Sequence, residues 1–309
     1  MKNPFSFGRR FRALYCTGTL TLAAALLLYT FVIPQKLAAV ETASAGTSAS
    51  TAADNTAQTA AATAAAVVTA TSYDDGNISI TITTERIDDT EVYIADITLS
   101  DISYLKTALA QSTYGRNIKE TTSDMAEENN AILAINGDYY GFRDSGYVLR
   151  NGTLYRDTSA GGEDLAILSD GSFYLFDEDD ITAEEVQAMG ALQIFSFGPA
   201  LVENGSVAVS ASEEVSQAMT SNPRTAIGIV SPLHYVIVVS DGRTSESSGL
   251  SLYQLAGVFA GLGCTEAYNL DGGGSSTLWF CGSVVNNPTG GAAGNGSSER
   301  KVSDIVYIG

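Results

Sequence analysis

The chain has 309 residues and carries 35 Asp and Glu against 16 Lys and Arg, which gives a formal net charge of −19. This acidic balance argues against general affinity for nucleic acid or for anionic lipid, because both kinds of partner select a basic surface. One histidine and three cysteines supply no His/Cys cluster for zinc and no Ser-His-Asp set for serine hydrolysis.

The N-terminal region divides into a basic flank over residues 1–13 and an uncharged apolar run over residues 14–33. At about 1.5 Å rise per residue, a helix of this length spans the roughly 30 Å hydrocarbon core of a bilayer. Basic residues favour the cytoplasmic side, so we predict a single-pass transmembrane helix with a cytoplasmic N-terminus in the cell membrane. The alternative is a secretory signal cleaved at Ala-Ser-Ala, residues 43–45; both interpretations place the rest of the chain outside the cell.

Residues 34–72 consist mainly of Ala, Thr and Ser, with almost no large apolar side chain. Such a segment buries too little surface to offset the entropy of ordering it, so we predict a disordered linker. Residues 73–309 then form one extracytoplasmic domain.

The first part of this domain contains strand-like patterns. Apolar and polar residues alternate over 78–87 and 91–99, as in half-buried antiparallel strands. Ser123 is expected to cap a short helix that ends near Asn130. The continuous apolar run 131–136 predicts a buried strand.

Hairpin turns are predicted where a turn dipeptide separates two apolar runs. The three dipeptides are Asn151-Gly152, Asp170-Gly171 and Asn204-Gly205. They favour type I′ turns, in which both central residues have positive φ. Between the second and third, a short acidic helix is predicted over residues 181–189, with Thr182 as its cap.

The last part of the domain combines strands with an amphipathic helix. Segments 225–230 and 235–242 are expected to pair as antiparallel strands, and Ser251 is expected to cap a helix that ends at Gly263. We therefore predict an α+β fold of largely antiparallel or mixed sheets with two or three packed helices.

Polar side chains repeatedly follow the ends of apolar strands. Asn136 and Asp138, then Asp241, then Asp271 come directly after such strands, each beside glycine, which lets a backbone approach a ligand closely. Asp-Gly is also a common turn dipeptide. Together with Arg224, which enters a strand after proline, the three carboxylates indicate a site.

Cys264 and Cys281 lie symmetrically about the glycine run. A hairpin turning at Gly272–Gly273 would place them opposite one another, and an exported domain permits a disulfide. Two free buried thiols are the alternative.

Six segments occur in a characteristic order: INGDYYG, FGPALVENG, NPRTAIGI, VVSDGR, GLSLYQLAGVFAGLGCTEAYNLDGGGSSTLWF and SSERKVSDIVYI. In this order they resemble the phosphodiester glycosidase family, and the resemblance covers most of residues 90–309. One position departs from it. Asp138 stands where members often have glycine, so its role does not follow from the resemblance.

The resemblance implies hydrolysis of a sugar-1-phosphodiester, such as a GlcNAc-1-phosphodiester, with release of free sugar. The substrate would be a phosphodiester-linked glycan of the cell surface or a nucleotide-sugar-like compound. An oxocarbenium-like centre requires a carboxylate, for which Asp271 is the first candidate, Asp241 the second and Asp138 the third. Any metal bound by these three would be a hard cation, Ca²⁺ or Mg²⁺.

Positive charge is needed for the phosphate, and guanidinium groups supply it as a bidentate fork. Arg224, Arg243 and Arg300 lie at the matching positions. The N–H groups of Gly272, Gly273 and Gly274 would add an anion-binding nest, and Asn136 and Ser275 would orient the substrate. Two alternatives remain: a non-catalytic polysaccharide-binding module and a metal-dependent phosphodiesterase.

Overall fold

The computed structural model describes residues 19–30, 32–40, 66–213, 221–290 and 298–309. A helix covers residues 19–30. Within the described residues, no helix has both the length and the apolar character needed to cross a membrane. Residues 1–18 and 31, which include the predicted basic flank and part of the predicted transmembrane helix, lie outside the described residues.

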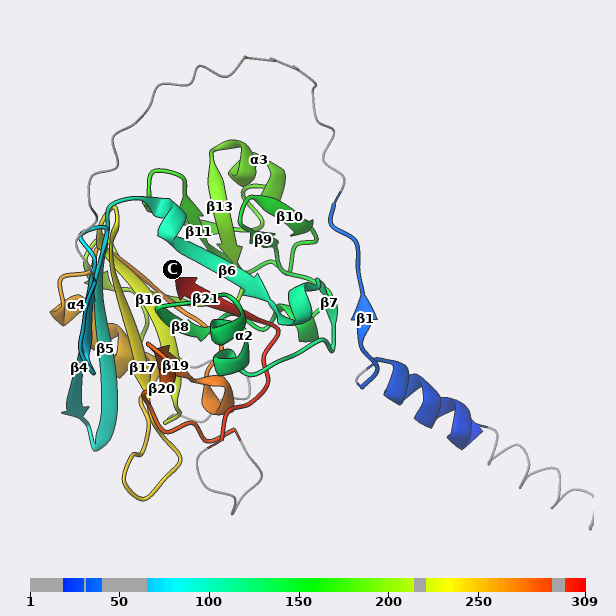
Figure 1. Cartoon of the computed structure of the whole chain (residues 1–309). Coiled ribbons are helices and arrows are strands. Elements are labelled where there is room, and N and C mark those ends of the chain that lie inside the picture. The colour runs from blue at the N-terminus through cyan, green and yellow to red at the C-terminus, as the bar shows by residue number, and fades with distance from the viewer. Residues whose placement is uncertain (1–18, 31, 41–65, 214–220, 291–297) are drawn as a thin grey trace, which may run out of the picture.

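The largest layer is a nine-stranded antiparallel sheet in the order β15-β14-β18-β16-β17-β5-β4-β3-β2 (Figure 1). Its strands are β2 Val67–Val68, β3 Ser72–Asp74, β4 Ile78–Ile87, β5 Thr90–Leu99, β14 Ala200–Glu203, β15 Ser206–Val207, β16 Arg224–Ser231, β17 His234–Ser240 and β18 Glu266–Asn269. The alternating pattern of β4 buries one face and exposes the other, which confirms the strand predicted there. Pairing of β16 with β17 confirms the second predicted antiparallel pair.

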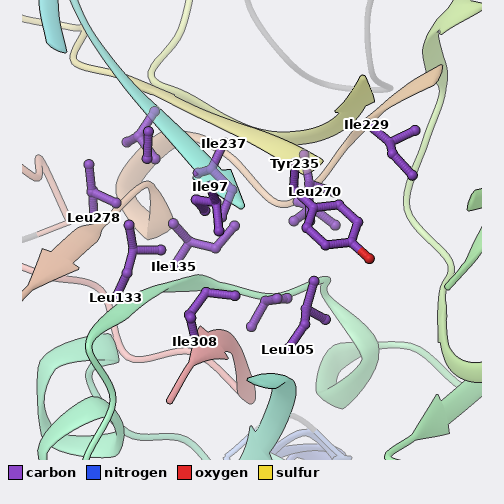
Figure 2. Close-up of a cluster of buried hydrophobic side chains, with 14 of the residues drawn as sticks. Ile97, Leu105, Leu133, Ile135, Ile229, Tyr235, Ile237, Leu270, Leu278 and Ile308 are labelled. Carbon is purple, nitrogen blue, oxygen red and sulfur yellow. The ribbon is translucent and has the colours of Figure 1, made fainter. Parts of the chain in front are cut away.

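A five-stranded antiparallel sheet, β20-β19-β8-β21-β6, packs against it. Its strands are β6 Leu105–Leu109, β8 Leu133–Asn136, β19 Leu278–Phe280, β20 Ser283–Val284 and β21 Asp304–Ile308. Figure 2 shows Ile97 and Ile237 of the large sheet facing Ile135 and Leu278 of this sheet. Each such side chain contributes about 1.5–3 kcal/mol when fully buried. This core holds the two sheets, and the loops at their edges, in fixed positions.

A third antiparallel sheet has the order β10-β9-β13-β11-β12. Its strands are β9 Val148–Arg150, β10 Thr153–Arg156, β11 Glu163–Leu168, β12 Phe173–Asp177 and β13 Ala191–Phe195. Asp164 on β11 is completely buried, and its protonated carboxyl group donates a hydrogen bond to the Glu178 carboxylate. Burial and the neighbouring Glu178 raise the pKa of Asp164 to about 10, so this side chain is a neutral acid at pH 7.

Three helices cover these sheets: α2 Thr122–Glu128, α3 Ala183–Ala188 and α4 Leu252–Gly261. The predicted caps of α3 and α4, Thr182 and Ser251, are confirmed, and both belong to complete capping boxes. The predicted cap of α2 is wrong by two residues, because Thr121 accepts the hydrogen bond from Asp124 N. Ser123 instead donates its hydroxyl hydrogen and its N–H to Glu299. These antiparallel sheets and packed helices confirm the α+β class.

Two of the three predicted type I′ turns are present. Asn151-Gly152 and Asn204-Gly205 have positive φ at both residues. At Asp170-Gly171 only the glycine has positive φ, and Asp170 uses its carboxylate to accept a hydrogen bond from Ser172 N at 2.9 Å. The turn at Asp170-Gly171 is therefore not of type I′, and the hydrogen bond between Ser172 N and the Asp170 carboxylate stabilises it instead.

Of the two alternatives for Cys264 and Cys281, a disulfide or free thiols, the structure has free thiols. Cys264 is buried beneath α4 on one face of the large sheet, whereas Cys281 is exposed at the end of β19 in the second sheet, and both thiols are free. The intervening residues are not a hairpin, since β18 and β19 belong to different sheets.

Parts of the predicted linker 34–72 contact the domain. Strand β1, Gln35–Lys36, pairs with β7, Gly115–Arg116, and Asn117 donates from its side-chain amide to the carbonyls of Thr30 and Ile33. Strand β2 joins the edge of the large sheet through β3. Residues 41–65 lie outside the described residues.

Candidate active site

One edge of the large sheet gathers the polar residues that follow its strands. Arg224, at the start of β16, pairs with Ser240 at the end of β17, and β18 ends nearby at Asn269. Asp241 comes directly after β17 and Asp271 comes two residues after the end of β18, so both lie at the same edge as Arg224. The antiparallel register therefore brings together positions far apart in the sequence, as the sequence predicted.

Asp271 is held by polar side chains on two sides. Ser275 donates its hydroxyl hydrogen to Asp271 Oδ2 at 2.6 Å, and Asn136 donates from its amide nitrogen to the carbonyl of Asp271 at 2.6 Å. Asn136 also accepts hydrogen bonds from the Thr225 hydroxyl and from Thr277 N. The end of β8, the start of β16 and the loop after β18 are thereby fixed to one another.

Burial raises the pKa of the Asp271 carboxyl. The Ser275 hydrogen bond and the positive charges of Arg300 and Arg143 oppose this effect, but the net direction is upward. Asp271 is consequently a carboxylate of increased basicity, which suits attack on an electrophilic carbon or activation of water.

The three glycines after Asp271 allow close approach of arginines and backbone. A Cβ on Gly273 would lie 3.0 Å from Arg243 Nη2, and a Cβ on Gly274 would lie 2.8 Å from Arg300 Nη2. A Cβ on Gly272 would lie 2.8 Å from the Pro223 carbonyl oxygen. These positions, which form part of the short 3₁₀ helix η4 Gly273–Ser275 and its cap, require glycine for packing.

All three predicted arginines meet this glycine run. Arg243 is fixed by Asn222 Oδ1, which accepts from its Nε at 3.0 Å and from its Nη2 at 2.7 Å. Arg300 is exposed and donates its backbone N–H to the carbonyl of Gly274. Arg224 is buried, and its Nε donates to the carbonyl of Leu250 at 2.8 Å.

Only some of the backbone N–H groups of the predicted anion-binding nest, Gly272 to Gly274, are available to a ligand. Gly273 donates its N–H to the Pro223 carbonyl at 2.8 Å, and Ser275 and Ser276 donate theirs within the loop. An anion at this site would therefore meet guanidinium groups rather than a row of free backbone amides.

Asp241 lies at the same edge, but its carboxylate is engaged by neighbouring residues. Oδ1 accepts from Asn287 N at 2.8 Å and from the Asn286 amide at 3.3 Å, while Oδ2 accepts from the Tyr93 hydroxyl at 3.2 Å. Asn286 also donates to the carbonyl of Ser276. Asp241 is therefore connected to the glycine loop through Asn286, and both of its oxygens already accept hydrogen bonds from the protein. This favours Asp271 over Asp241 as the reacting carboxylate.

Asp138 does not fit the predicted catalytic or metal-binding role. Its side chain has no exposed surface and forms an ion pair with Arg150 at 2.9 Å; Arg150 also pairs with Asp304 at 2.8 Å. Ser196 N and Tyr140 N complete its contacts. This buried network is structural, and it shapes the loop between β8 and β9. The portion of the chain that the structure describes contains no group of three or more His, Cys, Asp or Glu arranged to hold a metal.

Arg143 is a site residue that sequence reasoning missed. It follows η3, Tyr140–Phe142, and its guanidinium carbon lies 5.9 Å from the ring centre of Tyr139 and 5.0 Å from that of Phe197. Its charge acts on Asp271 together with that of Arg300. No motif marks it, since it lies just beyond INGDYYG and its position depends on Phe197, a distant residue.

Comparisons with known proteins indicate the family to which the chain is similar. A family model described as phosphodiester glycosidase matches residues 129–309. The SPbeta prophage-derived protein YomE of Bacillus subtilis is 32% identical over 205 residues, which cover 64% of this chain and 31% of YomE. N-acetylglucosamine-1-phosphodiester alpha-N-acetylglucosaminidase of Bos taurus is 27% identical over 212 residues, 62% of this chain and 39% of the bovine protein.

Two solved structures share the fold. The catalytic domain of zebrafish N-acetylglucosamine-1-phosphodiester alpha-N-acetylglucosaminidase, auto-inhibited by its pro-peptide, superposes with a TM-score of 0.59 at 21% identity, covering 75% of this chain and 82% of that one. A hypothetical protein from Synechocystis gives a TM-score of 0.56 at 15% identity, covering 75% and 62%. The chain spans between about three and four tenths of the length of the sequence relatives named above.

Proposed function

The chain belongs to the phosphodiester glycosidase family, and from this premise we propose that it hydrolyses glycosyl phosphodiesters of the GlcNAc-1-phosphodiester type. The observation that carries the proposal is the position of Asp271 beside a glycine loop against which Arg243 and Arg300 pack. One carboxylate and two nearby guanidinium groups match the charges of a sugar carbon that becomes positive and a phosphate that departs as an anion.

The reaction breaks the bond between the anomeric carbon and the phosphate oxygen, and the bonding electrons remain on that oxygen. Arg243 and Arg300 stabilise the departing phosphate, which stays on the aglycone as a monoester. Asp271 either attacks the anomeric carbon or removes a proton from the attacking water. Water supplies the new hydroxyl group of the free sugar.

We further propose that the substrate is a surface or secreted polysaccharide and that the domain is extracytoplasmic. The apolar run 14–33 after a basic flank supports a single-pass membrane helix, with the domain outside the cell. The acidic balance of the chain fits a neutral or phosphodiester glycan bound locally by arginines, rather than a polyanion bound over the whole surface.

Product analysis of the full chain tests the proposal. The chain is incubated with the methyl ester of GlcNAc-1-phosphate, with and without chelator, and the products are identified by mass spectrometry. Free GlcNAc and methyl phosphate are expected, whereas GlcNAc-1-phosphate and methanol would identify a phosphodiesterase. Asp271→Asn should lower kcat by about 10²–10⁴-fold while the dissociation constant for substrate changes little. Binding without any turnover by the wild type would identify a binding module instead.

A further inference from the structure

We propose that Arg143 binds a second anionic group of the substrate, so that the site selects glycosyl phosphodiesters whose aglycone carries an additional negative charge. This inference rests on the proposed function. It names a specificity residue and the class of substrate that the residue would select.

The first observation is that Arg143 has no carboxylate partner among the residues that the structure describes. Three other arginines of this acidic chain do form ion pairs: Arg86 with Glu91, Arg116 with Asp144, and Arg150 with Asp138 and Asp304. Within the described ranges, Arg143 pairs with no carboxylate, and its side chain makes a single hydrogen bond, from Nη1 to the carbonyl of Ser196 at 3.1 Å. In a chain with 35 acidic residues, such a charge is available to a ligand.

The second observation is that the guanidinium is held in place. It lies against the rings of Tyr139 and Phe197, and the Ser196 carbonyl fixes one end of its fork. A guanidinium stacked on aromatic faces keeps a planar set of donors in one orientation, and therefore loses little entropy when it binds an anion.

The loop that carries Arg143 is itself anchored by a buried arginine. Arg156 donates from Nε to the carbonyl of Gly146 at 2.6 Å, and from Nη1 to the carbonyls of Tyr140 and Arg143 at 3.1 and 2.8 Å. The Arg156 guanidinium thus donates hydrogen bonds to three backbone carbonyls of the loop that carries Arg143. This arrangement sets the position of Arg143 before any substrate binds.

The third observation concerns the number of charges. Arg243 and Arg300 already lie against the glycine loop, and a phosphodiester carries one negative charge. Arg143 adds a further cation, on the loop after β8, close enough to Asp271 and Tyr139 to influence both. A substrate with a diphosphate, or with a second phosphate on the aglycone, would use this charge.

The test compares two substrates that differ by one anionic phosphate group: the methyl ester of GlcNAc-1-phosphate and the methyl ester of GlcNAc-1-diphosphate. The full chain is assayed as wild type, Arg143→Ala and Arg143→Gln. Arg86→Ala is the control, since it removes the same charge from an exposed position on β4. Arg143→Gln removes the charge but keeps a polar side chain that can still donate to the carbonyl of Ser196, so it is expected to fold. Thermal melts monitor the folding of every variant.

The wild type should prefer the diphosphate compound by about tenfold or more in kcat/KM, as expected for one charge-assisted contact. Both Arg143 variants should lose that preference, and Arg86→Ala should retain it. Equal losses on both substrates, or no preference in the wild type, would overturn the proposal. If the wild type cleaves neither compound, the proposed function fails. The dissociation constants of Asp271→Asn and Asp271→Asn/Arg143→Ala for the two compounds then decide the role of Arg143 separately.

Discussion

At the scale of single residues, Asp271 combines burial with stabilising contacts. Burial raises its pKa, while the hydroxyl of Ser275 and the charge of Arg300 favour the ionised form. If the carboxylate is the reactive form, kcat/KM falls as the pH drops through this raised pKa. The acidic limb of the pH profile should therefore lie above the range of an ordinary aspartate.

Replacing Ser275 tests this assignment. Ser275→Ala removes a hydrogen bond to the charged form, so the pKa of Asp271 rises further and the acidic limb of kcat/KM moves to higher pH. Ser276→Ala, in the same loop, should leave the limb in place. The measurement is the pH dependence of kcat/KM; a limb that does not move, or that moves to lower pH, would contradict the role of Ser275.

At the scale of elements, the glycine loop is more constrained than a turn. Gly274 lies between Arg300 and the backbone of Gly290, where a Cβ would be 2.8 Å from Gly290 Cα. An arginine side chain can move aside, but the Gly290 backbone is hydrogen-bonded to Ser298. Gly257 on α4 differs, because a Cβ there would meet no atom within 4 Å.

A matched pair of glycine substitutions follows from this contrast. Gly274→Ala should displace Arg300 and lower kcat/KM by about tenfold or more, as expected for the loss of one charge-assisted contact. Gly257→Ala should leave kcat/KM unchanged and raise the free energy of unfolding by about 0.5–1 kcal/mol, because alanine favours helix. Enzyme assays and chemical denaturation of both variants check the pair, and similar activities would show that the loop tolerates a side chain.

Local signals in the sequence predicted these elements well, and non-local pairing was harder to predict. The alternation in 78–87 and the caps Thr182 and Ser251 depend on neighbouring residues, so they could be recognised. Thr121 and Ser123 are both good caps, and the choice between them depends on Glu299. The separation of β18 and β19 into different sheets depends on partners far along the chain.

For the candidate site as well, local sequence signals identified some residues, whereas residues whose role depends on distant partners could not be predicted. Asp271 was predicted from its position after an apolar strand, and the three arginines, Arg224, Arg243 and Arg300, from the family resemblance. The register of the large sheet places Arg224 beside the end of β17, and Arg243 and Arg300 pack against the glycine loop. The burial of Asp138 depends on Arg150 and Asp304, whose positions follow only from packing of two sheets. No local pattern in the sequence reveals such a partner.

At the scale of the whole molecule, buried Asp164 links stability to pH. Its pKa is raised to about 10 in the folded state, above that of an exposed aspartate in the unfolded chain, so the folded state holds this proton more tightly. The contribution to stability is therefore fully present at low pH and declines as the pH rises from about 4 towards 10.

Asp164→Asn should remove this dependence, because asparagine keeps a donor for Glu178 but has no proton to lose. We expect the variant to be more stable than the wild type at pH 8, with a smaller difference at pH 4.5. Urea denaturation at the two pH values measures the free energies of unfolding; parallel curves for wild type and variant would show that Asp164 does not titrate as described.

The pairing of β1 with β7 has a consequence for the reach of the domain. Residues 35–40 and β2 both contact the domain, so the segment between them starts and ends on the same body. The length of this segment therefore does not determine how far the candidate active site lies from the helix over residues 19–30. Lengthening the chain between Val40 and Val67 should therefore leave the contacts of residues 35–40 with the domain in place. Hydrogen exchange at the amides of Leu37 and Val40, which bond to Tyr114 and Leu154, should stay equally slow. The contacts of residues 35–40 therefore hold the domain close to the C-terminal end of the helix over residues 19–30.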